Sequence, residues 1–215
     1  MFRDAASVAA WLSPKREGRK TPTELQTRKT MIVVQDDMML DPLEVRAHAL
    51  AQTFYDWEGP DGQTYKRVWI GEVPGLREAI EEQMGPCHFL GMGYRLNYAG
   101  EMPNQSIHSD LGWGTHAAVV YLSAGDSGTA FWRHLPTGST EYHPDEYVAI
   151  LSDVDNIEAW EMRMMVSQRP NRGLIYESAL FHSRFPFEGF GSTPEDGRLI
   201  AVAFFTPIDS GLAQE

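Results

Sequence analysis

The first 86 residues carry hydrophobic side chains at helical spacing in two stretches, which follow a short apolar strand at residues 31–34. A helix is predicted over 41–53, because Asp41 is a preferred cap and the proline after it suits the first helical position. A second helix is predicted over 74–84, and Gly85-Pro86 ends it. The apolar positions at helical spacing are Leu43, Ala47, Leu50 and Phe54 in the first helix and Leu76, Ile80 and Met84 in the second. Both helices are expected to pack on a core and to carry no chemistry.

After Cys87 the pattern changes to short β-rich runs separated by clusters of Gly, Pro, Asn and Asp. These runs lie at 88–92, 95–98, 106–110, 117–122, 129–132, 147–151, 173–177 and 198–205. Short runs at this spacing indicate an antiparallel sandwich or barrel. The stretch 156–166 has a helical composition and is predicted to be a helix, and residues 168–173 are predicted to turn the chain back into the sheet.

The same pattern predicts two parts in the chain. Residues 1–30 combine a short helical piece with a basic link and are interpreted as a flexible arm. Residues 31–215 are predicted to form one domain, in which 31–86 is a helical support and 87–207 a barrel.

Composition narrows the possible partners. The 215 residues carry a net charge of −12, from 18 basic and 30 acidic side chains. That charge argues against nucleic-acid binding, which requires many phosphates to be neutralised. The single cysteine, Cys87, excludes a disulfide within the chain and indicates a reducing compartment. The N-terminal stretch has neither the apolar region of a secretory signal nor the length of a membrane span, so a cytoplasmic protein without membrane contact is expected.

The first candidate for chemistry is His108-Ser109-Asp110, where an imidazole and a carboxylate lie two residues apart. On an extended strand, side chains at this spacing point to the same face. One imidazole nitrogen and one carboxylate oxygen are two of the three ligands in the 2-His-1-carboxylate set that holds non-haem Fe(II). His182, which lies in the run 179–183, is the candidate for the third ligand.

A second motif of the same form, His143-Pro144-Asp145, lies in the polar stretch 140–146. Its proline argues against the strand geometry that would bring the two side chains together. This motif is therefore predicted to be a surface turn. The motif at 108–110 is favoured because it lies between an aromatic strand and the apolar run 117–122.

Arg198 is an isolated arginine at the start of the apolar strand 198–205. Alternation places Arg198, Ile200, Val202 and Phe204 on one face and Leu199, Ala201, Ala203 and Phe205 on the other. Both faces are apolar, which predicts a central strand with a guanidinium that is at least partly buried. A buried guanidinium needs an anion, which is either a structural Asp or Glu or, beside an iron site, a dicarboxylate cosubstrate.

The order HxD, distal His and then Arg on the next strand resembles the iron(II)/2-oxoglutarate-dependent oxygenases. The prolyl-4-hydroxylase-like subgroup, which includes uncharacterised bacterial and phage members, is the most similar. The match covers about 88–207 and includes Tyr98, the run Tyr121-Leu122-Ser123 and the run 128–132. The resemblance implies a mainly β fold with flanking helices, namely a double-stranded β-helix (jelly roll) with the helices of 41–85 packed on one sheet.

The resemblance also implies a role for each site residue. His108, Asp110 and His182 would hold Fe(II), Arg198 would pair with the far carboxylate of 2-oxoglutarate, and Tyr121 and Tyr98 would hydrogen-bond this cosubstrate. The interval from His182 to Arg198 is longer than is usual in the family, and a glycine-rich inserted turn at 188–197 accounts for the excess. Arg184 is the alternative anion binder. Arg184 and Trp113 are also candidates for contact with the substrate.

The implied reaction couples oxidative decarboxylation of 2-oxoglutarate by O₂ to hydroxylation of a C–H bond. Asp110 favours hydroxylation over halogenation, because halogenating relatives have a small residue at that position. The expected substrate is an amino-acid side chain in a protein or peptide, or a small metabolite. Nucleic-acid-repair relatives carry a second arginine shortly after the first, and none follows Arg198 here. The alternatives are a non-catalytic jelly-roll module and a cupin-like metal-binding protein without a cosubstrate.

Overall fold

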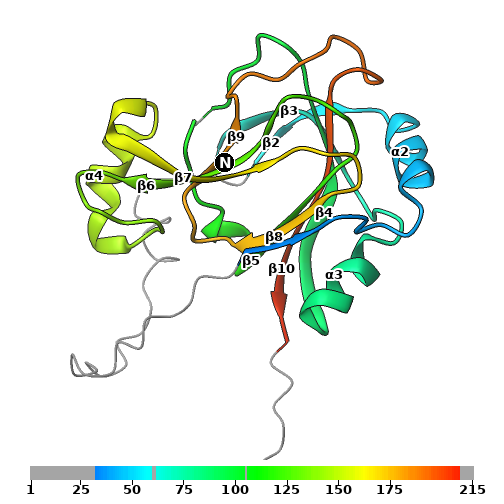
Figure 1. The fold of residues 1–215 in the computed structure, drawn as a ribbon, viewed down its shortest axis with the longest axis horizontal. Helices are drawn as coiled ribbons and strands as arrows, with labels where there is room; N and C mark the ends of the chain where they lie inside the picture. Colours follow the sequence, from blue (N-terminus) through cyan, green and yellow to red (C-terminus); the bar gives the residue numbers. More distant parts are fainter. Residues whose placement is uncertain (1–31, 60–61, 105, 209–215) are drawn as a thin grey trace, which may run out of the picture. The chain divides into compact units, whose positions relative to one another are not determined.

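The computed structural model describes residues 32–59, 62–104 and 106–208 (Figure 1). These residues belong to one compact unit and form two antiparallel sheets. The predicted arm at 1–30 lies outside the described residues. None of the described helices is long and apolar enough to cross a membrane.

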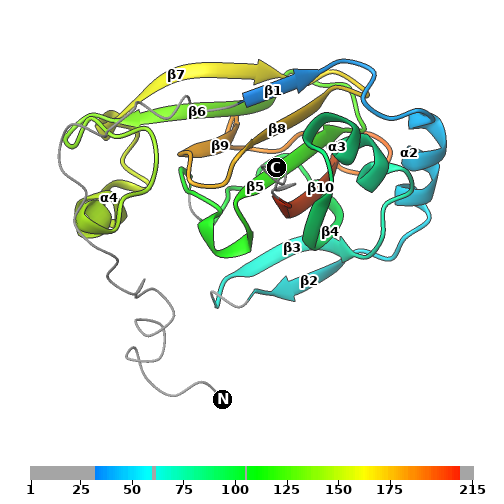
Figure 2. The same cartoon turned by 90° about the horizontal axis from the view of Figure 1, so that it is seen from below.

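The larger sheet has its described strands in the order β1-β8-β5-β10-β4-β3-β2, and the smaller sheet in the order β7-β6-β9. Figure 2 shows β1 and the hairpin of β2 and β3 at opposite edges of the larger sheet. The larger sheet contains β1 (Ile32–Gln35), β2 (Tyr55–Glu58), β3 (Thr64–Ile70), β4 (Cys87–Asn97), β5 (His116–Tyr121), β8 (Gly173–Glu177) and β10 (Arg198–Pro207). The smaller sheet contains β6 (Gly128–His134), β7 (Trp160–Ser167) and β9 (His182–Phe185).

The two sheets pack through their inner faces. Val119 of β5, Phe131 of β6 and Ile200 of β10 belong to one buried apolar cluster between the sheets. The outer face of the larger sheet is covered by the helices α2 (Pro42–Leu50) and α3 (Leu76–Met84), which share a second cluster with it. A mainly β jelly roll with helices packed on one sheet, as the sequence predicted, is confirmed.

Strand β10 lies in the middle of the larger sheet, between β5 and β4, and its two faces separate as alternation predicts. Leu199, Ala201, Ala203 and Phe205 belong to the core beneath the helices. Arg198, Ile200, Val202 and Phe204 line the cavity on the other face. The strand therefore needs apolar residues on both faces, one set for the core and one for the cavity wall.

The segment at 31–86 contributes strands as well as helices. Within it, β1 pairs with β8, and the hairpin of β2 and β3 pairs with β4. The two helices begin and end close to the predicted residues, and the Asp41 carboxylate accepts a hydrogen bond from the Glu44 backbone N–H at 3.0 Å. This capping bond satisfies one of the free N–H groups in the first turn of α2.

The core-facing side of α2 differs from the prediction. Val45 and Ala49 are buried, whereas Leu43 is 79% exposed and Ala47 is exposed as well. Apolar residues occur all around this helix, so more than one group of apolar side chains recurs at helical spacing, and the sequence does not show which group is buried. The packing against β4 selects the group that points at the sheet.

The structure also contradicts the predictions at 147–151 and 156–166. The first lies in a helix, α4 (Tyr147–Asp153), which follows the short 3-10 helix η3 (Pro144–Glu146). The second is mostly strand β7, which pairs with β6 over its whole length after the 3-10 helix η4 (Ile157–Ala159). Backbone hydrogen bonds to β6 outweigh the helical composition of β7, because tertiary pairing overrides local propensity.

Gly93 of β4 offers a test of how tightly the larger sheet is built. A Cβ at this position would overlap the backbone carbonyl of Trp69 on the neighbouring strand β3. Gly93→Ala is expected to lower the free energy of unfolding by about 1–3 kcal/mol, measured by urea denaturation. Gly91→Ala is the matched control, since nothing lies within 4 Å of a Cβ there. Equal losses in the two variants would contradict this packing.

Candidate metal centre and cavity

Residues from both sheets line a cavity of about 310 Å³. Its apolar wall comes from the inner faces of β5 and β10, where Val119, Ile200 and Val202 lie. Its polar side holds His108, Asp110 and His182. A cavity with apolar walls and a few convergent polar groups is the usual form of a small-molecule site.

The motif at 108–110 is not a strand, so the predicted reason for its geometry is wrong. His108 forms a single β-bridge with His182, through backbone hydrogen bonds of 3.1 and 2.9 Å in the two directions. Asp110 has left the extended conformation (φ −103°, ψ 23°) and begins the 3-10 helix η2 (Leu111–Trp113). Its backbone N–H donates to the Ser178 carbonyl at 2.8 Å. The β-bridge and this turn bring the three side chains together.

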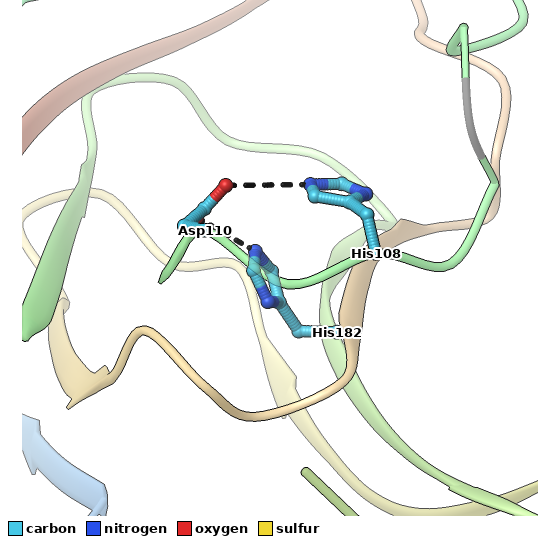
Figure 3. Close-up of side chains that lie close together, drawn as sticks. All are labelled: His108, Asp110 and His182. Atoms are coloured by element: carbon cyan, nitrogen blue, oxygen red, sulfur yellow. Dashed lines mark ion pairs between the residues drawn. The ribbon is translucent and has the colours of Figure 1, made fainter. Parts of the chain in front are cut away.

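Figure 3 shows these three side chains pointing toward one another. The Asp110 Oδ1 atom is 3.8 Å from His108 Nε2, and its Oδ2 atom is 3.1 Å from His182 Nε2. The three potential ligand atoms all lie within 4.8 Å of one another. Bonds from a metal to such atoms are about 2.0–2.2 Å long, so ligand atoms at right angles lie about 3 Å apart. The donor set fits a first-row divalent metal, and the separation of 3.1 Å between Asp110 Oδ2 and His182 Nε2 matches this spacing, whereas the 3.8 Å between Asp110 Oδ1 and His108 Nε2 is longer.

Electrostatics within this triad favour a charged pair. Burial raises the pKa of Asp110, but the combined effects of His182, His108 and Arg95 outweigh it and hold that pKa below its ordinary value. Burial lowers the pKa of His182, but the Asp110 carboxylate outweighs it and raises that pKa. The His182 Nδ1 atom lies 2.9 Å from the Leu180 carbonyl, an arrangement that keeps Nε2 toward Asp110 and the cavity.

Tyr176 is a cavity residue that sequence reasoning missed. Its hydroxyl lies 3.1 Å from His182 Nε2 and 3.5 Å from Asp110 Oδ2. Burial raises the pKa of Tyr176 well above its ordinary value, and the Asp110 carboxylate adds to the rise. The hydroxyl therefore keeps its proton and can donate it to an oxygen beside the triad. Alternation in the run 173–177 places Tyr176 inside, but nothing in the sequence connects it with the triad.

Arg198 is 3% exposed and has no ion pair among the described residues. Its Nη1 atom donates to Asn97 Oδ1 at 3.4 Å, its Nε has no partner in the described part of the chain, and the Tyr121 ring lies 5.9 Å from Cζ. Burial lowers the pKa of Arg198 to about 10, and the positive charge of Arg95 adds to this effect. No described Asp or Glu is a counter-ion of Arg198, which was one of the two alternatives that the sequence left open. A buried guanidinium without a described counter-ion fits an external anion, and the pairing of Arg198 with a cosubstrate carboxylate stays a prediction.

The other predicted residues divide into two groups. Trp113 and Arg184 line the cavity with the triad and Arg198. Tyr121 and Tyr98 are not among its described lining residues. The Tyr121 hydroxyl shares a hydrogen bond with Thr129 at 2.8 Å, and the Tyr98 ring packs under the Arg67 guanidinium at 4.4 Å. Contact of these two tyrosines with a cosubstrate stays a prediction.

Arg95 also lines the cavity and was missed from the sequence. It lies on the inner face of β4, opposite Ile200 of β10 and Val68 of β3. The signal that identified Arg198, an arginine inside an apolar strand, is present here too. In the run Gly91 to Asn97, alternation places Arg95 on the same face as the two glycines.

The sequence and the structure were compared with known proteins. No protein-family model matches the sequence, and no curated protein matches it. The non-haem α-ketoglutarate-dependent carbocyclase SnoK from nogalamycin biosynthesis is similar in structure, with a TM-score of 0.54, 13% identity and coverage of 88% of this chain and 87% of that one. AviO1 from Streptomyces viridochromogenes is similar with a TM-score of 0.52, 14% identity and coverage of 82% and 90%.

A viral collagen prolyl hydroxylase from Paramecium bursaria Chlorella virus-1 aligns with a TM-score of 0.40, 11% identity and coverage of 89% and 98%. Membership of the prolyl-4-hydroxylase-like subgroup stays a prediction. The likeness to SnoK and AviO1 concerns the arrangement of sheets and helices. The chain therefore has the jelly-roll fold of the non-haem, 2-oxoglutarate-dependent oxygenase superfamily, as its sequence motifs predicted.

Proposed function

We propose that the protein is an Fe(II)- and 2-oxoglutarate-dependent dioxygenase that hydroxylates a C–H bond. The observation that carries this proposal is the convergence of two imidazoles and one carboxylate beside a buried guanidinium that has no described counter-ion. Each feature alone has a structural explanation. Together in one cavity they match the two requirements of the reaction, namely a metal with open positions and a clamp for a dicarboxylate.

His108, Asp110 and His182 would hold the iron on one side and leave its other positions free for ligands. With Fe(II) and 2-oxoglutarate bound, the site would supply the activation of O₂, which would couple oxidative decarboxylation of 2-oxoglutarate to succinate and CO₂ with hydroxylation of a C–H bond. The Leu180 carbonyl orients the His182 ring. The apolar wall of Val119, Ile200 and Val202 excludes water from the reacting centre.

Arg198 is the better anchor for 2-oxoglutarate than Arg184. The Arg184 Nε and Nη2 atoms already donate to the backbone carbonyls of Phe187 and Glu101. Arg198 keeps a buried Nε without a described partner and is positioned by Asn97. A guanidinium with free donors can bind a carboxylate through two parallel hydrogen bonds, and such binding fixes the orientation of the cosubstrate.

The test of this function starts with Fe(II) and 2-oxoglutarate added together under nitrogen, and a visible charge-transfer band is expected. On admission of O₂, loss of 2-oxoglutarate should match the release of succinate, even slowly and without a substrate. Metal binding without the band or without succinate would contradict the proposal and favour a cupin-like or other non-catalytic jelly-roll module. Mass spectrometry of candidate peptides and metabolites, searched for one added oxygen atom, then identifies the substrate.

A further inference from the structure

The cavity contains more positive charge than the proposed cosubstrate can offset. Among its described lining residues, Arg95, Arg184 and Arg198 are cationic and Asp110 is the one carboxylate. If the proposed function holds, the two negative charges of 2-oxoglutarate and that of Asp110 offset the iron and one arginine. Two arginines then remain uncompensated, in a chain whose net charge is −12. Such a local excess of positive charge is an anion site.

Arg95 is the more available of these two arginines. It makes no hydrogen bond and no ion pair with any described residue, and its Nε is buried without a partner in the described ranges. Its guanidinium lies over the Tyr65 ring, with Cζ 5.2 Å from the ring centroid. Burial lowers the pKa of Arg95 below its ordinary value, and the opposing effects of Tyr65 and Asp110 are smaller. A ligand anion would stabilise the charge.

Arg184 is the other remaining arginine, and its guanidinium is less available to a ligand. Its two hydrogen bonds to the carbonyls of Phe187 and Glu101 hold its guanidinium in place. Burial lowers the pKa of Arg184 to about 9, and the charges of Arg95, Arg198 and Arg67 add to this effect. The cations therefore repel one another, and Arg184 strengthens the positive potential at Arg95 without having to contact the ligand itself.

Next to Arg95 the cavity wall consists of aromatic rings. The Trp57 ring lies 5.8 Å from that of Tyr65 and 5.5 Å from that of Trp113, and Trp113 stacks on Phe204 at 5.6 Å. All four side chains line the cavity. A surface of this kind binds an apolar, flat body, while the arginine at its edge selects a negative charge.

We infer that the substrate is a small organic anion whose carboxylate or phosphate group binds Arg95 and whose apolar body lies on the aromatic wall of Trp57, Tyr65 and Trp113. The volume of about 310 Å³ is at the low end for small-molecule pockets, which limits the substrate to a small body. The inference rests on the proposed function, because Arg198 is assigned to the cosubstrate.

Calorimetric titration of the full-length protein under nitrogen, with Fe(II) and saturating 2-oxoglutarate, tests this inference. The probes are benzoate, phenyl phosphate and the neutral benzamide, and at least one anion is expected to bind about tenfold or more tightly than benzamide. Arg95→Met should weaken that anion about tenfold to a hundredfold and leave benzamide unchanged. Arg163→Met is the control, since Arg163 is 52% exposed and is not a lining residue. The better anion distinguishes a carboxylate from a phosphate substrate.

Two further measurements separate this inference from the proposed function. Arg198→Met should lose 2-oxoglutarate binding but keep the anion probe, so the probe remains readable even if no cosubstrate ever binds. Arg95→Met without ligands should unfold at a higher temperature than the parent, because a buried charge without a described partner is removed, whereas a purely structural Arg95 would give a lower temperature. Equal affinities for the three probes, or an anion affinity unchanged in Arg95→Met, would overturn the inference.

Discussion

Replacing His182 with alanine is expected to weaken Fe(II) binding by about a hundredfold or more. His182 is 5% exposed, its Nε2 atom lies 3.1 Å from Asp110, and its β-bridge to His108 aligns the other imidazole. Loss of an outer-shell partner typically costs about 10–100-fold in metal affinity, so loss of a direct ligand should cost at least as much. The backbone bridge remains in the variant, because alanine keeps both hydrogen bonds. Calorimetric titration of the metal-free protein with Fe(II) under nitrogen measures the change.

The chain provides its own control for this experiment in the second HxD motif. His143 has an extended backbone (φ −126°, ψ 129°) and precedes η3, so the predicted turn is a 3-10 helix, but its side chain is 52% exposed, in line with the predicted surface position. His143→Ala is expected to leave the Fe(II) affinity unchanged. Equal affinity in the parent and in His182→Ala would show that the triad is not the metal site.

Replacing Arg198 with methionine is expected to weaken 2-oxoglutarate binding by about a hundredfold or more while Fe(II) remains bound. Hydrogen bonds to charged groups contribute roughly 1.5–3 kcal/mol each, and two parallel bonds to one carboxylate are lost together. Titration of the visible band with 2-oxoglutarate measures the affinity of the cosubstrate. Loss of iron in this variant would instead assign Arg198 to the support of the metal site.

Arg184→Met is the matched comparison, because the two arginines compete for the same role. Removing Arg184 deprives the carbonyls of Phe187 and Glu101 of their donor, so the free energy of unfolding should fall. Removing Arg198 takes away a buried charge without a described counter-ion and should leave that free energy unchanged or raise it. A larger loss of 2-oxoglutarate affinity in Arg184→Met than in Arg198→Met would move the anchor to Arg184.

The sequence predicted the features that depend on local pattern. Alternation along 198–205 correctly gave a central strand with a buried arginine and a different role for each face. The HxD motif and His182 do converge, although a β-bridge and a turn bring them together in place of a continuous strand. The sequence therefore identified the three side chains that converge. The strand that was assumed to align His108 with Asp110 is absent from the structure.

Features that depend on a distant partner could not be predicted. The segment 160–167 is a strand because β6 lies beside it, and nothing within its own composition reveals that partner. The buried side of α2 is set by the sheet beneath it, so Val45 replaces the predicted Leu43. Tyr176 comes beside the triad because β8 pairs with β5 and β1, which are distant in the sequence. In each case the deciding contact is far away in the sequence.

The two faces of β10 have a consequence for directed evolution of the protein. Ile200, Val202 and Phe204 shape the cavity wall, while their sequence neighbours Leu199, Ala201 and Ala203 hold the helices against the sheet. A library that randomises only the even-numbered positions from 200 to 204 therefore alters the accepted ligands and leaves the packing under the helices intact. Alternate residues of β10 thus determine ligand selectivity and the stability of the fold, so the two properties can be varied independently.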